Sequence, residues 1–276
     1  MLGKLIKQEF RATARIMLPV SGAVLVLALL ANLSIRGLSG NMSTIPVLRL
    51  FLLFIVIVYG AAIVAAAVMA MVIMISRFYR NLLKDEGYLM FTLPVSVHEL
   101  VWAKLIVSLV WFLVTGLLIS LVCSATALNI SHTSLAEVFR EMPGWAEIRD
   151  ALKELGIYNR LIGLTLQGIL AVLLTILTVC LHFYAAMSLG HMFSKEKILL
   201  SIVFYVVISF AFNLMQTGFS IAGFNAIDRL HPVMDSQNGI HDLMLIIWIV
   251  IGIKLVQSAV LYFATVLSLK RGLNLE

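Results

Sequence analysis

Long apolar runs separated by shorter polar stretches make up most of the chain. A run of about 20 apolar residues is long enough for an α-helix to cross the hydrocarbon core of a bilayer. Six such runs predict transmembrane helices at residues 16–35, 47–76, 96–128, 161–190, 198–222 and 243–269. A transmembrane β-barrel would instead show short segments of alternating hydrophobicity. The predicted fold class is therefore an all-α integral membrane protein, with one transmembrane domain over residues 1–276.

Residues 1–15 form a predicted amphipathic helix ahead of the first span. Its apolar and polar side chains recur at helical spacing on two different faces. The apolar face carries Leu2, Leu5, Ile6, Phe10 and Ala14, and the other face carries Lys4, Gln8, Arg11 and Arg15. A basic amphipathic helix of this kind lies in the membrane interface. There it serves either as a topology anchor or as a contact for a partner protein.

The stretch from Arg77 to Lys104 separates the second and third spans and has an unusual order of side chains. Bases are followed by an acidic pair and a short apolar run, and Pro94 ends the run. The spacing Ser96-x-x-Glu99 is a capping box, which predicts that the third helix begins near Ser96.

Two interpretations of this stretch stay open. One is a short amphipathic helix that inserts its apolar side chains into a groove of a partner protein, and the other is a short helix buried among lipid headgroups. The docking candidates are Tyr88, Leu89 and Phe91 as anchors, with Arg80, Lys84, Asp85 and Glu86 as a polar rim.

Residues 129–160 form a second amphipathic segment, on the opposite side of the membrane, that is too charged to span it. A helix lying on the surface of the membrane or the bundle is the default prediction. A lid that contacts a substrate is the alternative.

Composition and charge agree with a membrane protein and define its topology. Of the 276 residues, 62% are hydrophobic and 12% are charged, whereas soluble proteins average about 25% charged residues. With six spans both termini share one side, where twelve of the 20 bases lie, against seven on the other side. The positive-inside rule then predicts a multi-pass plasma-membrane protein with cytoplasmic termini. Because the bases are dispersed at helix ends, the net charge of +6 does not indicate nucleic-acid binding.

Sequence motifs for catalysis, nucleotide binding and metal binding are absent. The chain has no phosphate loop, no H-E-x-x-H and no G-x-S-x-G motif. His182 and His191 have no evident third ligand, and Cys123 and Cys180 lie inside apolar runs. We therefore predict no enzyme activity, metal or cofactor for this chain itself.

Lys254 is the one strong base within a predicted span. A Lys at the centre of a bilayer costs at least about 2.5 kcal/mol, so it should face the bundle, a water-filled cavity or a partner subunit. Gln257 lies one helical turn further on. Both residues are candidates for a translocation path, and a buried structural role is the alternative.

Taken in order, these features resemble the permease subunits of type 2 ABC exporters from Gram-positive bacteria. The resemblance rests on the basic amphipathic N-terminus, the long second span and the six-span layout. Its local motifs are Glu86-Gly87-Tyr88-Leu89, Leu93-Pro94-Val95-Ser96, Lys104, Gly190-His191-Met192-Phe193-Ser194-Lys195 and Lys270-Arg271-Gly272-Leu273-Asn274-Leu275-Glu276.

The resemblance implies a membrane permease that exports a cargo when a separate cytoplasmic ATP-binding-cassette subunit hydrolyses ATP. It also implies pairing with a second permease subunit, either an identical or a similar chain, and a coupling helix between spans two and three. An ATP-independent secondary transporter or channel and an intramembrane enzyme are the alternatives. Peptides, drugs, lipids and glycoconjugates all stay open as cargo.

Overall fold

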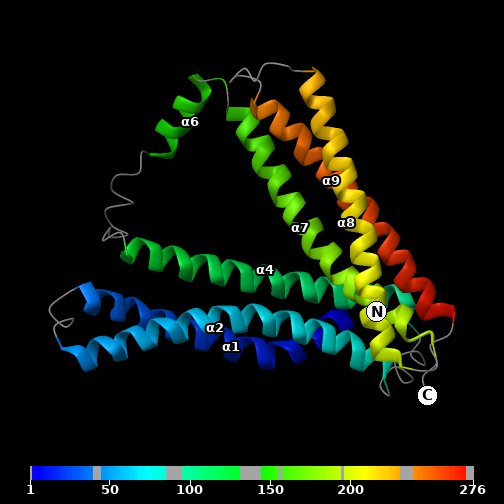
Figure 1. Ribbon diagram of the computed structural model, residues 1–276, viewed down its shortest axis with the longest axis horizontal. Helices are drawn as coiled ribbons and strands as arrows, with labels where there is room; N and C mark the ends of the chain where they lie inside the picture. Colours follow the sequence, from blue (N-terminus) through cyan, green and yellow to red (C-terminus); the bar gives the residue numbers. More distant parts are fainter. Residues whose placement is uncertain are drawn as a thin grey trace. The chain divides into compact units, whose positions relative to one another are not determined.

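The computed structural model describes residues 2–39, 45–84, 95–130, 144–154, 156, 158–193, 196–230 and 239–271. Within these ranges the regular secondary structure is all helical, with short turns and bends between helices and no strand. In chain order the helices are α1 (Leu2–Ser39), α2 (Pro46–Phe78), the π-helical turn η2 (Tyr79–Leu83), α4 (Val97–Ile130), α6 (Trp145–Glu154), α7 (Tyr158–Gly190), α8 (Lys197–Leu230) and α9 (Gly239–Arg271) (Figure 1).

Six of the described helices, α1, α2, α4, α7, α8 and α9, are long and apolar enough to cross a membrane. This confirms the predicted all-α fold class and the number of candidate spans. The outward faces of these helices carry large apolar side chains, and Leu29, Ile57 and Phe210 are each more than 60% exposed. Such faces suit lipid chains, which are as apolar as the side chains themselves.

The first helix is longer than the predicted span because α1 runs without a break from Leu2 to Ser39. The sequence pattern predicts an amphipathic helix over 1–15 and a span over 16–35 in this region. No helix-breaking residue stands at that boundary, and Pro19 is accommodated inside the helix. The boundary is therefore a change of composition along one continuous helix.

Two local predictions at the start of α4 and the end of α2 can be compared with the backbone. The Ser96 N–H donates to Glu99 Oε2 at 3.0 Å and the Glu99 N–H donates to Ser96 Oγ at 3.3 Å, which confirms the capping box. The second span continues through η2 to Leu83, and Lys84 then adopts an extended conformation. The later part of the predicted coupling helix, residues 85–94, lies outside the described residues.

The outer amphipathic segment predicted over 129–160 overlaps three elements. Helix α4 extends to Ile130, α6 spans Trp145–Glu154, and α7 begins at Tyr158. Gly156 ends α6: it has a φ of +67°, which favours glycine, and its N–H donates to the Lys153 carbonyl at 3.0 Å. Residues 131–143 lie outside the described residues.

The chain divides into two compact units. The amino-terminal unit comprises residues 3–74 and 106–144, and the carboxy-terminal unit comprises residues 1–2, 75–105 and 145–276. Helices α2 and α4 each contribute to both units.

In the amino-terminal unit, hydrogen bonds show the relative directions of α1 and α4. Trp111 Nε1 donates to Thr13 Oγ1 at 2.8 Å, and further along both helices Asn32 Nδ2 donates to Thr126 Oγ1 at 3.2 Å. The two helices are therefore parallel. Helix α2 runs the other way, because its Tyr59 hydroxyl lies 3.1 Å from Thr126 Oγ1 while its later residues pack beside Trp111.

The carboxy-terminal unit holds α7, α8 and α9. Thr178 of α7 lies 2.9 Å from Ser258 of α9, oxygen to oxygen, and a Cβ at Gly163 would lie 3.0 Å from Met244, so these two helices are parallel. Helix α8 is antiparallel to both. Within each unit, successive long helices therefore run in opposite directions.

Candidate functional site: a polar pocket between α7, α8 and α9

A polar pocket of about 180 Å³ lies within the carboxy-terminal unit. Its lining comes from the three long helices α7, α8 and α9 and is polar for helices of such apolar composition. The residues that line it are Thr178, Val179, His182, Tyr205, Ser209, Phe212, Asn213, Gln216, Lys254 and Gln257. The pocket brings together both predicted translocation-path residues, Lys254 and Gln257.

Lys254 is the charged centre of this pocket. It follows Leu243, the start of the α9 span, by eleven residues and precedes Lys270, the end of the span, by sixteen. At 1.5 Å per residue these separations are about 17 and 24 Å, so a bilayer core about 30 Å thick that α9 crosses would contain Lys254 well inside it. Lys254 Nζ donates a hydrogen bond to Gln216 Oε1 at 3.2 Å. A neutral amide therefore partners the ammonium group, and its positive charge is not cancelled.

Gln257 lies three residues after Lys254, which places both side chains on the same face of α9. Only 2% of Gln257 is exposed, and among the described residues its amide makes no side-chain hydrogen bond. The Gln257 amide is thus available to a molecule that enters the pocket.

His182 and Ser209 form the opposite part of the lining. His182 Nε2 lies 3.0 Å from Ser209 Oγ, and the imidazole ring packs edge-on against Tyr205 with the ring centroids 5.0 Å apart. This contact joins α7 to α8 at the pocket. In the sequence His182 stands out only as a histidine without an evident third ligand, and nothing there connects it with Lys254.

Two hydroxyl groups in the pocket region are already engaged with backbone. Thr178 Oγ1 donates to the Leu174 carbonyl at 2.6 Å, and Ser258 Oγ donates to the Lys254 carbonyl at 2.8 Å. Each hydroxyl has one proton, so these two groups offer mainly acceptor capacity to anything else. Lys254 supplies the charged donor in the pocket, and the amides of Asn213 and Gln257 and the Tyr205 hydroxyl supply neutral ones.

No protein-family model, curated protein or solved structure matches this chain. The site must therefore be understood from its own residues. Among the described residues no group of three or more His, Cys, Asp or Glu side chains could hold a metal ion.

The predicted coupling segment is described only at its two flanks. Arg80 and Lys84 are exposed, while the other candidate docking residues, Asp85, Glu86, Tyr88, Leu89 and Phe91, lie outside the described residues. The preceding flank is anchored on α7. Phe78 stacks on Tyr184 with ring centroids 3.9 Å apart, and Tyr79 packs edge-on against His191 at 5.3 Å.

The following flank is anchored on α9. The His98 Nδ1 and Tyr262 hydroxyl lie 2.7 Å apart, and Lys270 Nζ lies 3.3 Å from His98 Nε2. Because a protonated Lys only donates, His98 Nε2 accepts, and its Nδ1–H then donates to Tyr262. Both flanks of the segment thus contact helices that line the polar pocket.

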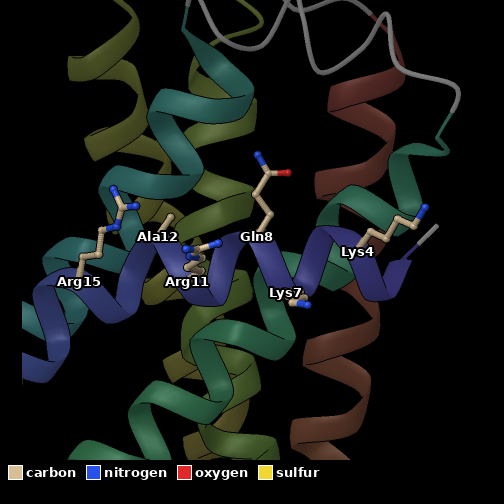
Figure 2. Close-up of a pocket in the computed structure, with 6 residues that line it drawn as sticks. All are labelled: Lys4, Lys7, Gln8, Arg11, Ala12 and Arg15. Carbon is tan, nitrogen blue, oxygen red and sulfur yellow. The ribbon is translucent and has the colours of Figure 1, made fainter.

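A second polar surface follows the first turns of α1. Figure 2 shows Lys4, Lys7, Gln8, Arg11, Ala12 and Arg15 along this one helix, where they line a shallow hollow. The bases lie on the helix itself and are exposed. This agrees with a polar face on residues 1–15, and it leaves open which molecule the face contacts.

Proposed function

We propose that this chain is the membrane-spanning permease subunit of an ATP-driven ABC transporter, working as an exporter. The observation that carries the proposal is the pocket between α7, α8 and α9, where Lys254 and Gln257 lie well inside the spans. Ionisable residues at such depth face a bundle interior or a water-filled cavity and commonly mark the route of a transported molecule. A translocation path through this unit explains why the chain keeps polar side chains whose placement inside a bilayer costs free energy.

Coupling to a separate ATP-binding subunit is supported by the contacts that the two flanks of residues 85–94 make with α7 and α9. On one side Phe78 and Tyr79 pack against the end of α7, and on the other side His98 contacts Tyr262 and Lys270 of α9. A displacement of the segment between them would therefore act directly on two helices that line the pocket. Packed interfaces transmit such displacements because they do not deform continuously.

The proposal includes a second permease subunit and a cytoplasmic ATP-binding-cassette subunit as partners. ATP hydrolysis belongs to the ATP-binding subunit, because this sequence has no phosphate loop. An ATP-independent secondary transporter is the competing function. It is favoured by the presence of two titratable side chains, Lys254 and His182, in one pocket inside the spans.

Purification of the tagged full chain from its native membrane in mild detergent tests the proposal. We expect a second chain that contains a phosphate loop to co-purify at a fixed ratio and to hydrolyse ATP. The variant Tyr88→Ala with Phe91→Ala should purify folded without that chain. A matched control, Phe51→Ala with Phe54→Ala, truncates two side chains that are 58% and 61% exposed on α2 and should retain it.

The competing function predicts a different outcome. If the chain purifies without any ATP-binding subunit, and its transport in vesicles follows a proton or ion gradient, the ABC assignment is wrong. If both double variants retained the ATP-binding chain equally, the assignment of residues 85–94 as the docking segment would be wrong.

A further inference from the structure

The pocket around Lys254 carries a positive charge without a counter-ion. Among its lining residues none is Asp or Glu, and among the described residues Lys254 has only the neutral Gln216 as a hydrogen-bond partner. An ammonium group inside a low-dielectric region attracts an anion far more strongly than it would in water. The electrostatics therefore favour an anionic ligand over a neutral or cationic one.

The second observation is independent of charge. Gln257 is 2% exposed, lines the pocket and has no side-chain hydrogen bond within the described part of the chain. Its amide N–H groups lie on the same face of α9 as Lys254, three residues apart. Two donors on one helical face, one of them charged, match the oxygen atoms of a carboxylate or phosphate.

The volume limits how much of a ligand fits. At about 180 Å³ the pocket is smaller than the 300–1,000 Å³ of sites that enclose drug-sized molecules. It can hold a single small anionic group, and the remainder of a larger molecule must lie outside. We propose that the pocket binds one carboxylate or phosphate group at Lys254 and Gln257, as the anchoring group of an anionic cargo.

Only the role of the bound anion as a cargo group rests on the proposed function. The binding of the anion requires neither ATP nor a partner chain. The anion could come from a soluble ion, from a membrane phospholipid or from an amphiphilic cargo. All three share the same chemistry at Lys254, and separate arms of one experiment distinguish them.

The experiment measures binding of decyl phosphate to the full chain in phosphatidylcholine nanodiscs by calorimetry. We expect saturable binding whose Kd rises about tenfold or more in Lys254→Met, because a charge-assisted hydrogen bond is lost. Lys254→Arg, which keeps the charge, and Lys270→Met, a matched removal of charge elsewhere on α9, should bind like the unaltered chain. Decanol, with the same tail and no charge, should not compete.

The arms then identify the source of the anion. Equal binding of inorganic phosphate would support the site with a soluble ion as ligand, and displacement by phosphatidylglycerol in the disc would support it with a membrane lipid. Unchanged affinity in Lys254→Met, or competition by decanol equal to that of decyl phosphate, would overturn the proposal. If Lys254→Met fails to fold, the competition between decanol and decyl phosphate still decides between these results.

Failure of this inference and failure of the proposed function are separate outcomes. A chain that binds decyl phosphate at Lys254 but has no ATP-binding partner keeps the anion site and loses the ABC assignment. A chain that co-purifies with an ATP-hydrolysing subunit but binds decyl phosphate and decanol alike keeps the ABC assignment and loses the anion site.

Discussion

The close approach between the end of α7 and the start of α8 offers a sharp test of the carboxy-terminal unit. Gly190 is the last residue of α7, and a Cβ added there would lie 2.6 Å from the Ser201 backbone nitrogen and 2.7 Å from its Cα. These are backbone atoms within the first turns of α8, so they cannot be displaced by a side-chain rotation. The two helices must separate to accommodate Gly190→Ala.

The expected loss in free energy of unfolding for Gly190→Ala follows from comparison with a second glycine on the same helix. Gly168 has no neighbouring atom within 4 Å of the position that a Cβ would take. Gly168→Ala gains the preference of a helix interior for Ala over Gly, about 0.5–1 kcal/mol, whereas Gly190→Ala, at the last residue of α7, gains no more than this. The steric clash at Gly190, for which overpacking predicts about 1–3 kcal/mol, should therefore dominate the difference in free energy of unfolding.

The assay is denaturant titration of both variants in the same detergent, followed by circular dichroism. Gly168→Ala should be as stable as the unaltered chain or slightly more stable, and Gly190→Ala should unfold at a lower denaturant concentration. Equal stability of the two variants would refute the close contact of α7 with α8 at this junction. It would also weaken the argument that the neighbouring coupling flank is firmly anchored.

Two further predictions concern polar groups outside the pocket. Trp111→Phe removes the hydrogen bond to Thr13 and should lower the free energy of unfolding by about 0.5–1.5 kcal/mol. The control Trp248→Phe, at a side chain that is 53% exposed, should change it little. Equal losses in the two variants would contradict the Trp111 contact. Burial lowers the pKa of His191, whose Nδ1 bonds to the Met187 carbonyl, because the imidazolium form is costly away from water. The neutral form is then favoured on folding, so stability should fall as the pH drops below about 6.5, the ordinary value for His. His191→Gln should reduce this pH dependence in a thermal-unfolding series, and an unchanged dependence would assign it to other groups.

Much of the fold could be predicted because lipid imposes strict rules on a chain. Every backbone polar group in the bilayer core must be satisfied within the protein, so long apolar runs become helices. The capping box at Ser96 and Glu99 was equally predictable, because its three hydrogen bonds depend on residues three positions apart. The predicted boundary between the amphipathic helix over 1–15 and the span over 16–35 had no such local signal. A change from the membrane interface to its core does not by itself interrupt a helix.

The candidate site was only half predictable. Lys254 stood out because charge is rare and costly in a span, and Gln257 followed from its position one turn away. The partners of the pocket did not stand out, since Gln216 lies 38 residues from Lys254 and Ser209 lies 27 residues from His182. Neutral polar side chains in a span have weak sequence signals, and only the packing of α7, α8 and α9 shows that they converge.

The proposed function requires that ATP hydrolysis by a partner subunit changes the pocket between α7, α8 and α9. The most direct measurement uses Ser209→Cys in a chain whose Cys123 and Cys180 are replaced by Ser, purified with the ATP-binding subunit that the proposed function requires. The rate at which a water-soluble maleimide modifies position 209 is compared with and without ATP. We predict that ATP changes this rate severalfold and that Tyr88→Ala with Phe91→Ala abolishes the change. Identical rates with and without ATP, in a complex that hydrolyses ATP, would contradict the account.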